Sequence, residues 1–114
     1  MKNNLPCAIK RFSALSDGTS EGFRELASFY LKSAVEQLSE LKKAVHSADP
    51  KNAERIAHSA AGVNDTVGFF DLGSLFRRVE EKAGHGDLGR AGPVLQMIDA
   101  EFEKVKQLLN AYSG

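Results

Sequence analysis

Apolar residues recur every three or four positions along most of the chain, which is the period of an amphipathic α-helix. The longest such stretch runs from about Ser20 to Ser47, and at 1.5 Å per residue it predicts a helix roughly 40 Å long. Its apolar positions are Phe23, Leu26, Ala27, Tyr30, Ala34, Leu38, Leu41 and Val45. No segment alternates between apolar and polar residues as a half-buried strand does. The pattern therefore predicts an all-α protein.

Turn signals divide the rest of the chain into further helices. Asp49 is a suitable cap for a second helix that begins at Pro50, because proline is tolerated at the first helical position. This helix should run to about Val67 and stop at Gly68. A third helix is predicted from Leu72, Leu75, Phe76, Val79 and Ala83, and a fourth from Val94, Leu95, Ile98, Phe102, Val105, Leu108 and Tyr112.

The connections between these helices are short, and short connections join antiparallel neighbours. An apolar pattern through Leu15 predicts a further short helix that covers one end of the bundle. The predicted fold is therefore an up-down antiparallel four-helix bundle with a short N-terminal helix. Pro93 leaves two possibilities open: it begins the last helix proper, or it kinks a helix that Asp87 has opened with a preliminary turn.

Length and charge balance restrict the possible functions. At 114 residues the chain suits one domain, so we assign residues 1–114 to a single domain with a core of about 17–112. Fifteen Lys and Arg balance fifteen Asp and Glu, which removes the general attraction of a basic protein to nucleic acid or to an anionic membrane. A single cysteine forms no internal disulfide, and charges interrupt the N-terminal apolar stretch that a signal peptide needs. We expect a cytoplasmic monomer.

The second predicted helix carries a histidine outside its apolar face. At 100° per residue, His58 lies about 140° around the helix from Ala53, while the apolar stripe centres near Ala60. Gly62 follows one turn later on the same surface, although a glycine inside a helix costs about 1 kcal/mol relative to alanine. With Ala61 and Ser59 it leaves a low platform that a phosphoryl group or another protein could approach. The alternatives are an ordinary surface histidine and a glycine that serves close helix packing.

Residues 57–68, with the sequence AHSAAGVNDTVG, resemble the active helix of histidine-containing phosphotransfer domains. In that family a histidine is followed by glycine four residues later and by another glycine before the next helix. The similarity covers roughly residues 17–110 and includes the flanking helices.

The resemblance implies that His58 carries a phosphoryl group to or from the aspartate of a partner receiver domain in two-component signalling. The chain would then act as a phosphohistidine intermediate rather than as a stand-alone enzyme. The resemblance also implies no cofactor of the chain's own, because Mg²⁺ and most of the charge stabilisation belong to the receiver.

One position departs from the family pattern. The family usually has lysine three residues after its histidine, where this chain has Ala61. A cation there would offset phosphoryl charge. Arg55, one turn before His58, is a candidate replacement, and it is equally an ordinary solvated helix residue.

The turn at Gly68 predicts which residues of the third helix lie near His58. If the second and third helices fold back there, residues equally far from the turn meet, which places His58 near Arg77, Arg78 and Glu80. The resemblance implies that Glu80 accepts a hydrogen bond from His58 Nδ1–H and leaves Nε2 free as the nucleophile. The alternative is a surface Glu80 that pairs with Lys82 or Arg77.

A docking surface for receivers is predicted on the exposed face around His58. We assign Ala61, Gly62, Asp65 and Phe69 to it, although Phe69 could equally be a core residue beside Phe70. An alternative function is a four-helix adaptor that binds receiver or kinase domains without being phosphorylated.

A metal-binding bundle is a third class of function. It would need inward carboxylates and Glu-x-x-His pairs on facing helices. His46 and His85 lie near predicted helix ends, so we expect no metal site.

Overall fold

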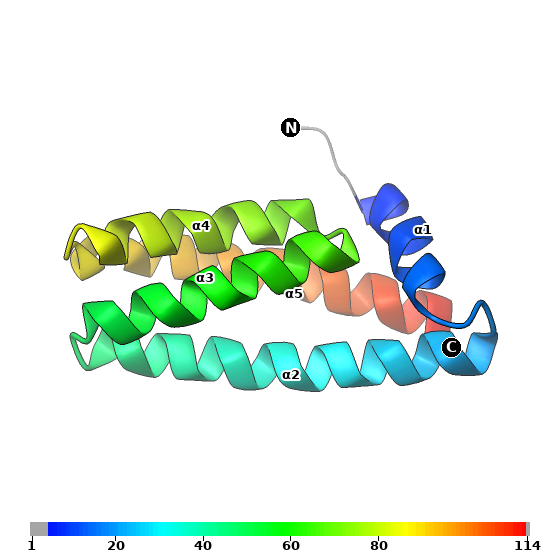
Figure 1. Ribbon diagram of the computed structural model, residues 1–114. Coiled ribbons are helices and arrows are strands. Elements are labelled where there is room, and N and C mark those ends of the chain that lie inside the picture. The colour runs from blue at the N-terminus through cyan, green and yellow to red at the C-terminus, as the bar shows by residue number, and fades with distance from the viewer. Residues whose placement is uncertain (1–4, 114) are drawn as a thin grey trace.

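The computed structural model describes residues 5–113, and the side chains of residues 8–112. Over that range it contains only helices, which are α1 (Leu5–Leu15), α2 (Ser20–His46), α3 (Pro50–Val67), α4 (Phe70–Gly84), a short 3-10 turn η1 (Leu88–Arg90) and α5 (Ala91–Ser113) (Figure 1). The predicted all-α fold is confirmed.

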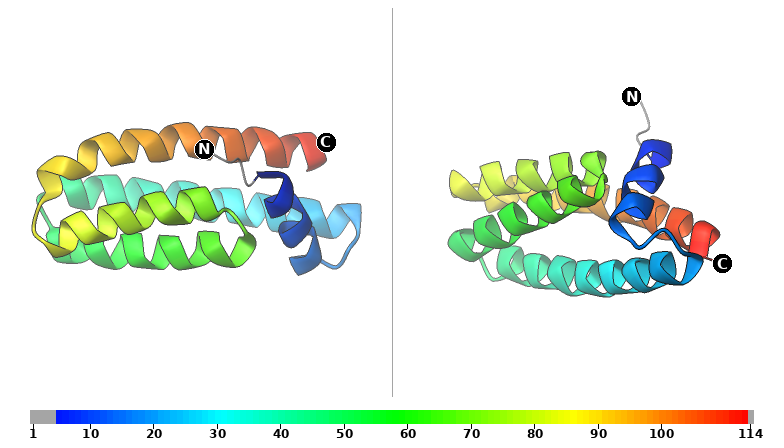
Figure 2. Two further views of the ribbon diagram at one scale, coloured as in Figure 1. Left: turned by 90° about the horizontal axis from the view of Figure 1, so that it is seen from above. Right: turned by 45° about the vertical axis from the view of Figure 1, so that its right-hand side comes forward.

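The four long helices run alternately up and down, as the short connections predict (Figure 1). α2 and α5 are the longest, and the α3–α4 hairpin lies against them over part of their length (Figure 2). α1 lies beside the α3–α4 turn and packs on both α3 and α5. It therefore covers the end of the bundle that the shorter hairpin leaves uncovered. None of the described helices is both long and apolar enough to cross a membrane.

The ends of α3 form as the turn signals predict. Asp49 accepts a hydrogen bond from the backbone N–H of Asn52 at 3.2 Å, and Pro50 occupies the first position of the helix. Gly68 ends the helix in the left-handed conformation, with φ of 95°. A side chain disfavours this conformation and glycine does not, so glycine suits the position.

The two possibilities at Pro93 are resolved in favour of a helix start. α5 begins at Ala91, so Pro93 lies in its first turn, where a backbone N–H would have no intrahelical acceptor. The preliminary turn after Asp87 is the separate 3-10 turn η1.

An aromatic cluster fills the core beneath α1. Phe12 packs edge-on against Phe23, with ring centroids 5.3 Å apart, and lies 5.8 Å from the ring of Phe69. Tyr30 completes the cluster at 5.2 Å from Phe69. These rings come from α1, α2 and the α3–α4 turn, so the cluster joins three segments that are distant in sequence.

One buried polar pair links α2 to α3. The Tyr30 hydroxyl donates to Asn64 Oδ1 at 2.6 Å, and Asn64 Nδ2 donates to the carbonyl of Ala60 at 2.8 Å. Burial raises the pKa of the Tyr30 hydroxyl, which keeps it protonated as the donor. The side chain of Asn64, six residues after His58, thereby has its hydrogen-bond partners inside the bundle.

The turn at Gly68 provides a test of this packing. A Cβ at Gly68 would lie 3.0 Å from Arg11 Cδ and 3.3 Å from the Cα of Ala8, in addition to straining the backbone. Gly86 also has a positive φ, of 71°, but a Cβ there would meet nothing within 4 Å. Gly68→Ala should lower the free energy of unfolding by about 2–3 kcal/mol and Gly86→Ala by about 1 kcal/mol. Denaturant titration measures both, and equal losses would show that contact with α1 contributes nothing.

Candidate functional site

His58 lies in the middle of α3 on its solvent-facing side. Its side chain is 76% exposed, which agrees with its predicted place outside the apolar stripe. Two of its exposed neighbours, Ser59 beside it and Gly62 one turn later, are small residues. Nothing in the fold therefore hides the outer edge of the imidazole ring from another molecule.

Glu80 on α4 holds the inner edge of that ring. Its Oε2 lies 2.8 Å from His58 Nδ1, and its side chain is 28% exposed. The predicted contact between Glu80 and His58 is therefore present. Glu80 pairs with the imidazole and not with the alternatives, Lys82 and Arg77. An ionised carboxylate only accepts hydrogen bonds, so this contact assigns the proton of a neutral imidazole to Nδ1. Nε2 is then left with its lone pair on the exposed side.

The two arginines predicted near His58 have different surroundings. Arg77 forms an ion pair with Asp65 of α3. Arg78 does not join the site, because its Nη1 lies 3.8 Å from the sulfur of Met97 on α5. The next residue of a helix is rotated by about 100°, which turns Arg78 toward α5 while Arg77 and Glu80 face α3.

Arg55 has a local partner. Its Nη2 donates to Asn52 Oδ1 at 2.6 Å, one turn toward the beginning of α3. The pairing of Arg55 with a phosphoryl group on His58 stays a prediction.

Gly62 and Gly73 have contrasting roles. A Cβ at Gly73 would collide with the carboxylate of Asp65 and lie 3.4 Å from the Ala61 carbonyl, so this glycine allows α3 and α4 to pack closely. A Cβ at Gly62 would meet nothing within 4 Å. Helix packing therefore does not require glycine at position 62, and this excludes the packing alternative considered for it.

Two residues assigned to the docking surface are buried, and those assignments were wrong. Ala61 is 3% exposed because it faces α4 at the close approach beside Gly73. Phe69 is 2% exposed because the left-handed turn at Gly68 directs it into the aromatic cluster, which was the alternative considered for it. Its neighbour Phe70 is the exposed ring.

Exposed apolar residues of α2 and α3 gather around the part of α3 that follows His58. A groove of about 450 Å³ lies between these helices, and it is lined by Leu26, Phe29, Tyr30, Ser33, Ala34, Glu36, Gln37, Glu40, Val63, Asn64 and Val67. Phe29 is 61% exposed and Val63 is 45% exposed. The sequence contains the signal for this groove, because Phe29 falls outside the apolar stripe of its helix. We did not predict it.

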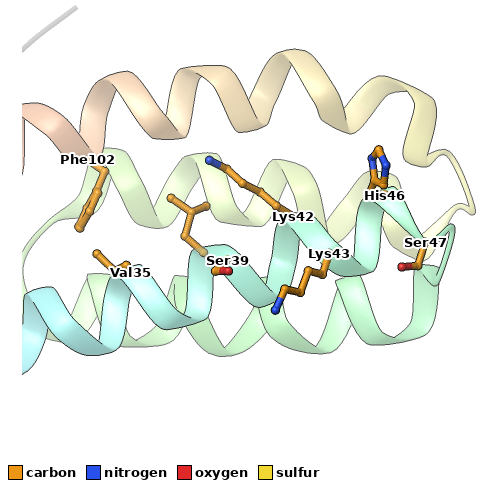
Figure 3. A pocket seen from close by; sticks show the side chains of 8 residues that line it. Val35, Ser39, Lys42, Lys43, His46, Ser47 and Phe102 are labelled. Atoms are coloured by element: carbon orange, nitrogen blue, oxygen red, sulfur yellow. The ribbon is translucent and has the colours of Figure 1, made fainter.

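The other two histidines lie elsewhere. His46, in the last turn of α2, borders a second groove of about 550 Å³ between α2 and α5, whose apolar lining includes Val35 and Phe102 (Figure 3). Lys42 in this groove is paired with Asp99 of α5 at 2.8 Å. His85 follows the end of α4. The exposed, small-residue surface of α3 therefore distinguishes His58 from both.

Comparisons with known proteins give one structural match. No family model and no curated protein sequence match the chain. The structure matches the crystal structure of histidine-containing phosphotransfer protein B (HptB) from Pseudomonas aeruginosa PAO1, with a TM-score of 0.83 and 23% sequence identity. The match covers 91% of this chain and 90% of that chain. The chain therefore has the fold of a histidine-containing phosphotransfer protein, and the predicted resemblance is confirmed at the level of the fold.

The contact between His58 and Glu80 can be tested without any partner. Nitrogen NMR of neutral His58 should show the Nδ1–H tautomer in the wild type, because Glu80 accepts that proton. Glu80→Ala removes the acceptor and should shift the tautomer ratio toward Nε2–H by about tenfold, since a charge-assisted hydrogen bond contributes about 1.5 kcal/mol or more. Glu80→Gln keeps an acceptor oxygen without its charge and should give a tautomer ratio between those of the wild type and Glu80→Ala. A wild type in which Nε2–H predominates would contradict the assignment.

Proposed function

We propose that the chain is a phosphorelay intermediate, in which His58 takes a phosphoryl group from the aspartyl phosphate of one receiver domain and passes it to the aspartate of another. The observation that carries the proposal is the pair of His58 and Glu80, which directs Nε2 outward on an exposed face. The fold shared with histidine-containing phosphotransfer protein B supports it.

The transfer step needs few groups from this chain. The lone pair of His58 Nε2 attacks phosphorus in line, the bond from phosphorus to the receiver's aspartyl oxygen breaks, and the carboxylate leaves with the bonding electrons. Nδ1 keeps its proton, so the imidazole becomes positively charged while it carries the phosphoryl group. Glu80 offsets this positive charge at 2.8 Å. The reverse sequence delivers the group to the second receiver.

The receiver supplies the rest of the chemistry in this proposal. Its Mg²⁺ neutralises the charge on the transferred group, so the chain itself needs a positioned imidazole and a docking surface. It acts as a phosphohistidine carrier and not as a stand-alone enzyme. We place it as a monomer in the cytoplasm, where it would meet receivers of response regulators or hybrid kinases.

We propose that the docking surface extends from His58 across α3 to the groove beside α2. Ser59 and Gly62 form its low centre, and Phe29 and Val63 offer exposed apolar area on the α2 side. Asp65 lies at its α4 edge. An apolar centre with a polar rim suits a transient protein interface, which buries less than about 600 Å² on each partner.

A phosphorylated receiver domain tests the proposed function. Incubation with the wild type should transfer acid-labile phosphate to this chain, and His58→Gln should abolish the transfer while helicity measured by circular dichroism is kept. His46→Gln and His85→Gln are the matched controls and should still be labelled. Label that persists in His58→Gln would identify a different nucleophile. A wild type that binds receivers and takes no label would instead be the unphosphorylated adaptor.

Two substitutions at Gly62 distinguish an effect on stability from an effect on phosphotransfer. Gly62→Ala should raise the free energy of unfolding by about 0.5–1 kcal/mol, because the position is helical and open. Gly62→Gln projects a long side chain into the docking surface and should slow phosphotransfer by about tenfold or more. Ala100→Gln, at an exposed position of α5, is the control. Unchanged transfer in Gly62→Gln would remove α3's exposed face from the interface.

A further inference from the structure

A cation lies along the seam between α3 and α4, within one turn of Glu80. His58 meets Glu80 across this seam, and a Cβ at Gly73 would meet Asp65, so facing residues are those equally distant from the α3–α4 turn. The same register places Arg77 opposite Ala61. Arg77 and Glu80 are three residues apart on α4 and therefore share a face of that helix.

Phosphorylation creates a charge imbalance at this seam. A phosphoryl group carries about −1.5 to −2 at neutral pH. Glu80 is itself an anion, and it is engaged by Nδ1–H on the other side of the ring. On α3, the neighbouring positions Ala61 and Gly62 bear no charge, and Asp65 adds a further negative charge. A stable phosphohistidine here calls for a cation that the resting contacts of His58 do not supply.

The other arginines close to the site in sequence are directed elsewhere. Arg55 is hydrogen-bonded to Asn52, and Arg78 is directed at Met97 on α5. The Arg77 side chain is more than half exposed and pairs with Asp65. Arg77 and Glu80 also border one shallow hollow of about 440 Å³, with Glu54, Glu81, Gly84 and His85. Arg77 therefore has open space on the side toward Glu80.

The energetic balance favours an exchange of partners. A partly exposed ion pair such as the one between Arg77 and Asp65 contributes little to stability. A guanidinium binds a phosphoryl group through two parallel charge-assisted hydrogen bonds, which is a stronger arrangement than a partly exposed pair with one carboxylate. The larger negative charge of the phosphoryl group adds to this preference.

We infer that Arg77 is the phosphoryl-binding residue of this site, and that it stays paired with Asp65 until His58 is phosphorylated. The inference rests on the proposed function. Arg77 exchanges Asp65 for the phosphoryl oxygens on Nε2 by rotation of its side chain toward the hollow that it shares with Glu80. Asp65 thus competes with the phosphoryl group for the guanidinium and weakens its hold on the phosphorylated state.

Phosphoramidate, a small phosphoryl donor, tests this inference without a receiver. His58 Nε2 attacks its phosphorus and the P–N bond breaks. The bonding electrons leave with the phosphoramidate nitrogen, which is already protonated and departs as ammonia. Arg77→Ala should lower the rate of His58 labelling by about three- to thirtyfold. Asp65→Asn frees the guanidinium and should raise the rate about two- to fivefold. Arg78→Ala, a change at the neighbouring arginine that faces α5, should leave it unchanged.

The opposite signs distinguish phosphoryl binding from a structural ion pair. If the pair only stabilised the hairpin, Arg77→Ala and Asp65→Asn would lower labelling together, and that result would overturn the inference. Phosphorus NMR gives a second readout, because the phosphohistidine resonance should titrate at higher pH in Arg77→Ala. Glu54, Glu80, Glu81 and His85 border the same hollow and are unchanged in every variant.

The failure of this inference differs from failure of the proposed function. A wild type labelled at His58, with equal rates and equal phosphorus titrations in Arg77→Ala and Asp65→Asn, would overturn the role of Arg77 and leave the carrier function standing. A wild type that accepts no phosphoryl group from either phosphoramidate or a receiver would overturn both. Circular dichroism of each variant confirms that the bundle is folded before the rates are compared.

Discussion

The close approach of α3 and α4 is the constraint on which the rest of the site depends. Gly68 turns the chain with a left-handed backbone, and Gly73 has no side chain to keep the two helices apart. Once these two positions set the register, Glu80 arrives opposite His58 and Arg77 arrives opposite Ala61. The orientation of the imidazole is therefore a consequence of helix packing at the other end of the hairpin.

This arrangement divides the chemistry between two sides of one ring. The inner nitrogen faces a carboxylate that fixes its proton, and the outer nitrogen faces solvent and a small-residue surface. The apolar groove beside α2 lies on the other flank of α3. A partner that covers both flanks would shield the reacting atoms from water while it makes contact with Phe29 and Val63, which links binding energy to the geometry of transfer.

The features that follow from local rules could be predicted from the sequence. Asp49, Pro50 and Gly68 bound α3 because capping and glycine conformation act over a few residues. Counting from the turn predicts that Glu80 lies near His58, since two antiparallel helices keep a common register, whereas its hydrogen bond to Nδ1 was implied by the family resemblance. Ala61 and Phe69 were misplaced because their burial depends on how closely α4 approaches and on the direction of the chain after Gly68.

Other parts of the site needed the three-dimensional structure. Counting from the turn placed both Arg77 and Arg78 near His58, but it does not say which face of α4 meets α3. The ion pair between Arg77 and Asp65 depends on which carboxylate the close approach of α3 and α4 brings within reach, and the sequence alone does not show this. The sequence shows that Phe29 is an apolar residue outside the apolar stripe of its helix. It does not show that Phe29 and Val63 line the same groove, because they lie on different helices.

α1 holds one end of the α3–α4 hairpin in place. Arg11 of this helix donates to the carbonyl of Thr66 at 2.9 Å, so α1 clamps the last turn of α3 and shields the aromatic cluster. His58 lies about ten residues before Gly68, roughly 15 Å along the helix axis. If α1 detaches, the turn at Gly68 loses this contact. Because that turn sets the register between α3 and α4, the alignment of Glu80 with His58 depends on a helix that packs at the far end of the hairpin.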